Sequence, residues 1–194
     1  MAEYVIYAGP TVEPLSAAEA KSHLRVDDAT DDTLIGDYIE AARQFVEAFT
    51  RRQLITATWY CYLDEFPAED YIELNFPPLQ STNFVLKYYD VNGVQQTWAA
   101  SNYSIDVASI PGRVILAYGV SWPSTRDIYN AIQITFKAGY GDAATAVPEA
   151  LRLAMRQLIS HWYENREAVS TDKQMTIPLG VERLLWPYRD LRFS

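Results

Sequence analysis

Few residues of the chain could act as a catalytic base or nucleophile. It has two histidines, His23 and His161, and one cysteine, Cys61. A serine-hydrolase site needs a nucleophile, a base and an orienting carboxylate, and here the base would have to be one of the two histidines. We expect His23 near the end of a short helix and His161 in the last turns of a long one, where the helix dipole favours an imidazolium ion. We therefore assign no catalytic residue and expect a protein that is not an enzyme.

The possible metal ligands do not form a recognised ligand set. A lone cysteine excludes a cysteine-based zinc site, and His161 with Glu164 would supply two ligands where a site needs more. Four aspartates also precede a predicted helix: Asp27, Asp28, Asp31 and Asp32. They lack the glycine and the closing glutamate of a calcium-binding loop, so helix capping explains them better. We assign no metal ligand.

Motifs for phosphate or acid–base chemistry are also incomplete. Gly139-Tyr140-Gly141 lacks the lysine of a phosphate-binding loop and the third glycine of a dinucleotide fingerprint. The acidic pairs Asp64-Glu65 and Glu69-Asp70 are adjacent in sequence, so the two members of each pair cannot share one face of a strand. We assign no cofactor and no cofactor-binding residue.

Aromatic side chains are abundant, with 14 tyrosines and 5 tryptophans. They could form a stacking platform for sugars or bases. Most of them fall at positions that suit the core of strands and helices, and tyrosine is also enriched in protein–protein interfaces. We interpret them as core and interface residues, and keep a carbohydrate-binding β module as an alternative.

The composition describes a folded, acidic chain. Its 194 residues are 49% hydrophobic, which excludes a disordered protein. The formal net charge of −9 argues against a protein dedicated to duplex DNA or to a membrane surface. We find no signal peptide and no apolar stretch long enough to span a membrane. One cysteine allows no intrachain disulfide, so we expect assembly in a reducing compartment.

Local signals predict two helices near the N-terminus. Ser16 and Glu19 have the spacing of a capping box, in which the two side chains bond each other's backbone amides, and a helix should follow as far as Leu24. After Asp31, apolar residues recur at three- and four-residue steps to Phe49, which indicates a long helix with a wide apolar stripe.

Two more helices are predicted near the C-terminus. Pro148 suits the first turn of a helix that should run to about Glu167. Residues 170–176 are polar, and we expect them to be mobile. A short final helix over 180–192 should be broken by Pro187. We expect segment 180–194 to gain order on a partner, because a terminal segment can do so without disturbing the core.

Between these helices the apolar period changes to two. Alternation and turn residues predict strands, with Asn92-Gly93 at a hairpin turn. The expected strands are 55–63, 71–75, 84–89, 95–98, 103–107, 113–118 and 132–137.

The order helices, strands, helices predicts an α+β fold. We expect a helical bundle of N- and C-terminal helices with an inserted antiparallel β subdomain. The whole chain, 1–194, would be a single domain, with a helical part over 13–52 and 147–192 and a β-rich part over 54–140.

An ordered set of segments resembles the head–tail connector (adaptor) family of long-tailed bacteriophages, prophages and gene transfer agents, across most of residues 13–189. The segments are EPLSAAEAKSHL at 13–24, DDTLIGDYIEAAR at 31–43, RRQLITATW at 51–59, PPLQS at 77–81, YSID at 103–106, PGR at 111–113, FKAGYG at 136–141, VPEAL at 147–151, HWYENREA at 161–168, IPLGV at 177–181 and LLWPYR at 184–189.

The resemblance implies a structural virion protein of the neck, assembled in the host cytoplasm. It implies a homo-oligomeric ring of twelve subunits beneath the portal protein, which extends the DNA channel and gives a docking platform to the next neck (stopper) or tail-completion protein. Genomic DNA would pass through without sequence-specific binding, and no membrane is involved. Another neck or tail-completion protein is the main alternative.

A contact with the portal through the C-terminal segment follows as a hypothesis. We expect it to use apolar, aromatic and basic residues of that segment: Leu184, Leu185, Trp186, Tyr188, Arg189 and Arg192.

Overall fold

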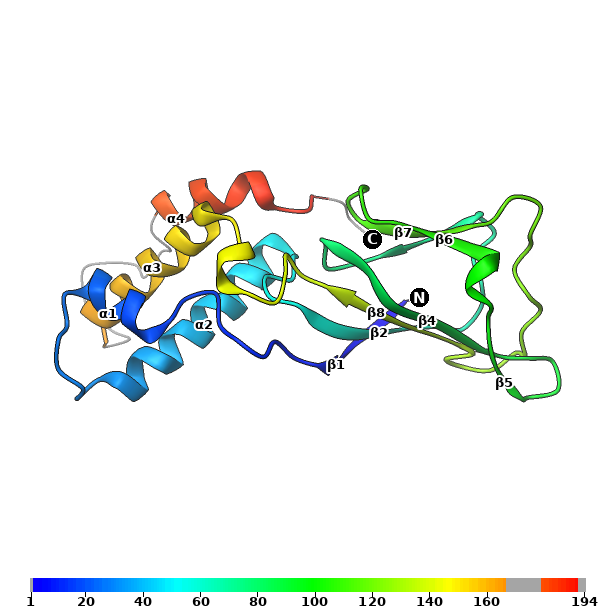
Figure 1. Ribbon diagram of the computed structural model, residues 1–194, viewed down its shortest axis with the longest axis horizontal. Coiled ribbons are helices and arrows are strands. Elements are labelled where there is room, and N and C mark those ends of the chain that lie inside the picture. The colour runs from blue at the N-terminus through cyan, green and yellow to red at the C-terminus, as the bar shows by residue number, and fades with distance from the viewer. Residues whose placement is uncertain (1, 167–178, 192–194) are drawn as a thin grey trace, which may run out of the picture. The chain divides into compact units, whose positions relative to one another are not determined.

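The computed structural model describes residues 2–166 and 179–191, and it divides into two compact units. Residues 1–10 and 56–139 form a β unit, and residues 11–55 and 140–194 form a helical unit. The described residues combine helices with antiparallel sheets, which confirms the mixed α and β composition that the pattern of apolar residues predicts. Figure 1 shows the elements of each unit.

The helical unit is built on α1 (Ala17–Leu24), α2 (Asp32–Thr50), α3 (Glu149–Glu164) and α4 (Leu179–Leu185), with short 3-10 helices at 144–146 and 186–188. The predicted capping box is confirmed, because Ser16 Oγ accepts from Glu19 N while the Glu19 carboxylate accepts from Ser16 N. The apolar stripes of α2 and α3 enter one core, in which Ile35, Leu151 and Met155 are fully buried.

Helix α4 belongs to that core. Val181 and Leu185 are fully buried in it, and Leu184 and Tyr188 pack against it. The expectation that segment 180–194 orders only on a partner is therefore wrong for 180–191, because its apolar residues already have an intramolecular surface to cover. The segment 170–176 lies outside the described residues.

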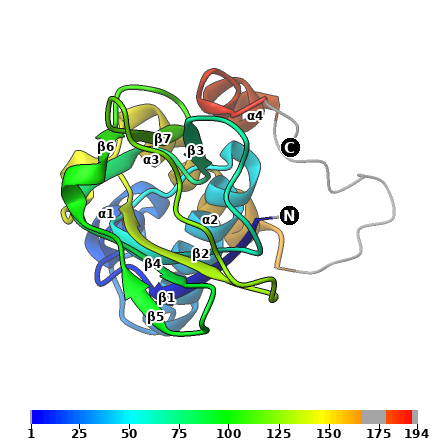
Figure 2. The ribbon, with the colours of Figure 1, turned by 90° about the vertical axis from the view of Figure 1, so that its right-hand side faces the viewer.

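The β unit contains two antiparallel sheets. A five-stranded sheet has the order β1-β2-β8-β4-β5, and a three-stranded sheet has the order β3-β7-β6. The strands are β1 (Glu3–Ala8), β2 (Ala57–Leu63), β3 (Tyr71–Leu74), β4 (Leu79–Tyr89), β5 (Gln95–Thr97), β6 (Tyr103–Asp106), β7 (Gly112–Leu116) and β8 (Ile132–Ala138). Figure 2 shows β1 beside β2 in the larger sheet.

The core of the β unit lies between the two sheets. Inward residues of the larger sheet, such as Cys61, Ile134 and Phe136, share one buried cluster with Leu74 and Val114 of the smaller sheet. The alternation that predicted β2 and β8 is thus the alternation of buried and half-exposed faces. Register joins Cys61 to Ile134 and Ile134 to Leu86, so the inward residues of three strands meet in one row.

Two features of the β unit differ from the prediction. Strand β1 was not predicted, and β4 begins at Leu79, five residues before the predicted strand. The predicted hairpin turn at Asn92-Gly93 is confirmed by the antiparallel pairing of β4 with β5, and of its two residues Gly93 alone has a positive φ, of 81°. Gly93 N donates to Asp90 O and Asp90 N donates to Val94 O, which is the hydrogen-bonding pattern of a type I turn with a glycine bulge.

Candidate docking surface at the C-terminal helix

The last described residues are tied to the end of α2. Asp190 N donates to Thr50 O at 3.0 Å, and Arg52 Nε donates to Tyr188 O. Thr50 is itself buried, and its hydroxyl donates to Val46 O at 2.6 Å. The chain can leave α2 at this point because Arg51 takes a left-handed conformation, with φ 57°. The backbone that carries the predicted docking residues is therefore held by the helical unit.

The predicted docking residues separate into buried and exposed groups. Leu185 is fully buried, so the structure assigns it to packing. Leu184 and Tyr188 are half-buried against the core, whereas Trp186 is 55% exposed. Arg189 is half-buried, and Arg192 lies outside the described residues. Trp186 and Arg189 thus present the largest accessible groups of the set.

Trp186, Arg189 and Phe49 form a stack. The Arg189 guanidinium carbon lies 5.4 Å from the centre of the Trp186 ring and 5.2 Å from that of Phe49. A cation held over an aromatic face keeps both groups in one geometry. Tryptophan and arginine are also the residues most often found at the energetic centre of protein–protein contacts. We call Trp186 and Arg189 the docking pair.

Tyr140 is half-buried against the helical core, near Arg52 and Tyr188. Burial raises the pKa of Tyr140, and the nearby Arg52 guanidinium partly opposes that rise.

The histidines and aspartates are dispersed in the structure. His23 lines a shallow surface pocket with Ser22 and Arg156, whereas His161 lies in the last turn of α3. Within residues 2–166 and 179–191 no three His, Cys, Asp or Glu side chains come together as possible metal ligands.

Asp31 occupies the cap position of α2 but does not cap it. Its side chain makes no cap hydrogen bond. Instead Asp31 Oδ2 accepts from Tyr163 Oη at 2.6 Å and from Arg166 at 2.7 Å, which lowers the pKa of the carboxyl. The capping interpretation is wrong for Asp31, whose carboxylate joins the start of α2 to the end of α3.

Most of the tryptophans serve the cores. Trp59 and Trp98 are buried, and Trp122 and Trp162 are half-buried in aromatic clusters. Trp59 stacks on Phe76 with ring centres 4.1 Å apart. Among the five tryptophans, all within the described residues, Trp186 is the exposed one. The structure thus favours core and interface roles over a tryptophan platform.

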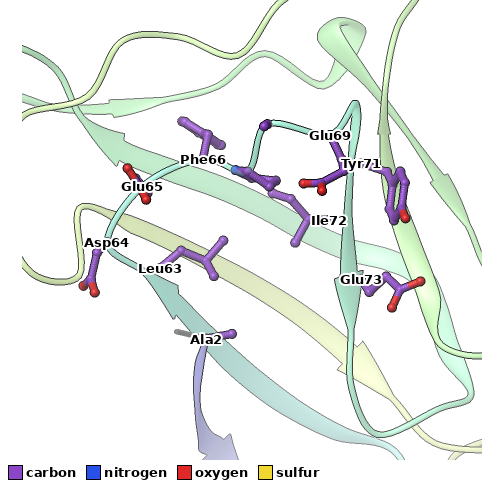
Figure 3. A pocket seen from close by; sticks show the side chains of 11 residues that line it. Ala2, Leu63, Asp64, Glu65, Phe66, Glu69, Tyr71, Ile72 and Glu73 are labelled. Atoms are coloured by element: carbon purple, nitrogen blue, oxygen red, sulfur yellow. The ribbon is translucent and has the colours of Figure 1, made fainter. Parts of the chain in front are cut away.

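A second surface feature is an open pocket of about 470 Å³ in the β unit. Figure 3 shows apolar side chains of Leu63, Phe66 and Ile72 in it. Four carboxylates also line it: Asp64, Glu65, Glu69 and Glu73. Glu73 is paired with Arg113 at 3.0 Å, and Asp64 Oδ1 accepts from Asn130 N at 2.8 Å. An apolar wall with carboxylates suits a basic side chain, whose methylene groups can lie on apolar surface.

No helix in the described parts of the chain has both the length and the apolar character needed to cross a bilayer.

The described residues thus combine two packed cores with an exposed tryptophan beside an arginine. A family model describes the relatives as phage gp6-like head–tail connector proteins, and it matches residues 16–98 and 124–189. The chain therefore belongs to the phage gp6-like head–tail connector family, whose role is structural. A search of curated proteins found no match.

Solved structures of gene transfer agent (GTA) particles contain chains with this fold. A chain of the virion of a native GTA particle is 24% identical with a TM-score of 0.79, over 98% of this chain and 97% of that one. A chain in the neck of an empty GTA particle, computed with C6 symmetry, is 23% identical with a TM-score of 0.76, over 100% and 97%. A chain in the neck of a native GTA particle, computed with C12 symmetry, is 24% identical with a TM-score of 0.75, over 100% and 97%.

Proposed function

We propose that this protein is a ring-forming connector in the neck of a tailed phage or gene transfer agent particle. The family match over more than half of the chain carries this proposal. The similar chains from GTA necks support a position between head and tail, and the C12 symmetry used for one of them supports a ring of twelve subunits.

In this proposal the ring assembles in the host cytoplasm and sits beneath the portal protein. Its other side receives the next neck or tail-completion protein. Genomic DNA passes through the ring, which binds no particular sequence. A net charge of −9 per subunit favours passage over retention, because DNA binding grows with the number of phosphates that cations neutralise. A carbohydrate-binding module has less support, because four of the five tryptophans lie in or against the cores.

The docking pair is the proposed contact with the portal. Leu184 and Tyr188 hold it on the helical core, and Arg192 extends the basic character of the same segment. Truncating α4 would remove two fully buried side chains, Val181 and Leu185, so loss of binding in a truncated chain would not separate docking from folding. Substitution of an exposed residue does separate them.

The test is attachment of purified chain to portal-bearing heads that lack the connector. We expect Trp186→Ala to weaken attachment by roughly 30-fold, since truncation of a central tryptophan costs about 2 kcal/mol or more. Tyr129→Ala is the matched control, because it removes a 90% exposed aromatic ring from the β unit. Both variants should keep the far-UV circular dichroism spectrum of the unchanged chain.

If the Trp186→Ala variant attaches to the heads with the same affinity as the unchanged chain, the proposed contact of Trp186 with the portal is rejected. Binding of the unchanged chain to isolated tails, with none to portal-bearing heads, would favour a tail-completion protein instead.

A further inference from the structure

One face of the five-stranded sheet has no layer of the β unit over it. The inward residues of β2 and β8 form the core with the three-stranded sheet, so the alternate residues point outward. These outward positions are half-exposed along both strands. We call this surface the tyrosine face and define it by Val5, Tyr7, Tyr60, Tyr62, Lys87 and Lys137.

The tyrosine face carries a row of aromatic rings in contact. The ring centres of Tyr7 and Tyr60 are 4.6 Å apart, and those of Tyr60 and Tyr62 are 5.9 Å apart. Tyr62 is further held by Gln133, whose Nε2 donates to the phenol oxygen at 3.1 Å. Tyr7 is 64% exposed and Val5 44% exposed. Rigid tyrosines offer contact area at a low cost in conformational entropy.

The charge of the tyrosine face is opposite to that of the chain. Register places Lys87 beside Gln133 and Lys137 beside Thr58 on the outward side. Neither lysine has an ion-pair partner within the described residues. The face has one carboxylate, Glu3, at its edge, whereas the chain carries 25 acidic residues. Its partner should therefore be acidic.

The same unit carries an acidic surface elsewhere. The segment 64–70, which we call the acidic loop, joins β2 to β3 and lines the pocket of about 470 Å³. Its carboxylates at Glu65, Glu69 and Asp70 are exposed, and the described residues hold no ion-pair partner for them. Phe66 and Leu63 supply apolar wall beside these carboxylates. Unpaired cations on one face thus match unpaired carboxylates and apolar surface on another.

We propose that the tyrosine face of one copy of this chain docks on the acidic loop of the next copy. The inference rests on the proposed ring, for which it names the lateral contact. A closed ring needs two different, complementary surfaces on each subunit, and these two surfaces meet that requirement within one unit. DNA is the less suitable partner, because a backbone contact of useful strength uses several cations and this face has two.

Charge reversal with rescue tests the pairing. We expect Lys87→Glu with Lys137→Glu to raise the concentration needed for ring assembly on portal-bearing heads at least tenfold, because like charges then face each other. Adding Glu65→Lys and Glu69→Lys to that chain should restore assembly. Arg25→Glu is the control charge reversal, since Arg25 is exposed and follows α1 in the helical unit, outside the C-terminal segment that carries the docking pair.

Crosslinking tests the geometry directly. A chain with Lys137→Cys is mixed with a chain with Glu69→Cys on the heads, and a bismaleimide is added. Only a contact between copies can join the two variants. Cys61 is fully buried, so it should not react. Replacing Glu69→Cys by Val107→Cys, at an exposed position just after β6, is the control pair.

We expect crosslinked dimers from the Lys137→Cys and Glu69→Cys mixture, and none from the control pair. The proposed lateral contact is overturned if the unchanged chain forms rings but gives no crosslink and charge reversal has no effect. In that case the proposed function stands. If the unchanged chain neither attaches to heads nor forms rings, the proposed function fails and the inference fails with it.

Discussion

Removal of the Arg43 side chain should destabilise the helical unit strongly. Its side chain is 10% exposed and lies in α2, with Nε bonded to Glu13 at 2.8 Å and Nη1 to Glu47 at 3.0 Å. Glu47 is also shielded, with 17% of its side chain exposed, and it accepts from Gln53 Nε2 and from Leu54 N. The Arg43–Glu47 ion pair is thus linked by hydrogen bonds to Gln53 and Leu54, which follow the end of α2.

The expected loss follows from what Arg43→Met leaves behind. Methionine replaces the apolar stem, so little cavity forms, but the Glu47 carboxylate remains shielded from water without its cation. Breaking a buried ion pair in this way costs about 3–5 kcal/mol. Urea unfolding followed by far-UV circular dichroism measures the difference. Arg166→Met is the matched control, because the Arg166–Asp31 pair is more open, at 47% and 24% exposure, and we expect little change there.

The loss should also depend on pH. Burial raises the pKa of Glu47 above its ordinary value, and Arg43 counteracts the rise. Without Arg43 the pKa of Glu47 in the folded variant rises further above its value in the unfolded chain. The folded variant therefore takes up a proton at a higher pH than the unfolded chain does. Its stability relative to the wild type therefore recovers as pH falls through that pKa, by about 1.4 kcal/mol for each unit by which the two native pKa values differ.

We expect the difference in unfolding free energy to be larger at about pH 8 than at about pH 5. A difference that is constant, or that grows on acidification, would refute a buried, uncompensated Glu47 as the cause.

Two further predictions concern the β unit. Gly112→Ala should lower the free energy of unfolding by about 1–3 kcal/mol through overpacking, because a Cβ there would lie 2.4 Å from Leu79 Cβ. Gly9→Ala is the control, since a Cβ at Gly9 has no atom within 4 Å, and it should leave stability unchanged in the same thermal unfolding measurement. Cys61 should react slowly with iodoacetamide at neutral pH and rapidly in urea, because burial raises its thiol pKa to about 11. Fast reaction in the folded protein would mean that β1, whose Tyr4 lies opposite Cys61, does not cover the thiol.

Docking and packing residues could not be separated along the C-terminal segment by sequence. Leu184, Leu185, Trp186 and Tyr188 are adjacent apolar or aromatic residues, and any of them could face a partner. In the structure Leu185 enters the helical core and Trp186 remains exposed beside Arg189. The orientation of α4 on α2 and α3 decides this, and it depends on contacts between residues far apart in sequence.

The same distinction applies to the tyrosine face. Alternation in β2 indicated that Tyr60 and Tyr62 share a side of the strand, but not whether a second layer covers that side. The two-sheet core of the β unit shows that the covered side is that of Cys61 and Phe136. Sequence predicted only that neighbouring carboxylates of the acidic loop do not share one face of a strand. The apolar wall beside them includes Leu63 of the larger sheet and Ile72 of the smaller one, which come from different sheets and could not be placed together by sequence.

The sequence by itself determined the elements whose signals are local. The capping box at Ser16 and the apolar stripe of α2 depend on residues within one or two turns, and both were predicted correctly. Tertiary structure decided the rest. Strand β1 exists because Glu3–Ala8 finds the edge of β2, and β4 starts at Leu79 because that residue pairs with Ala138. A strand's hydrogen bonds go to a distant partner, so its extent is settled by the partner's position and not by its own residues.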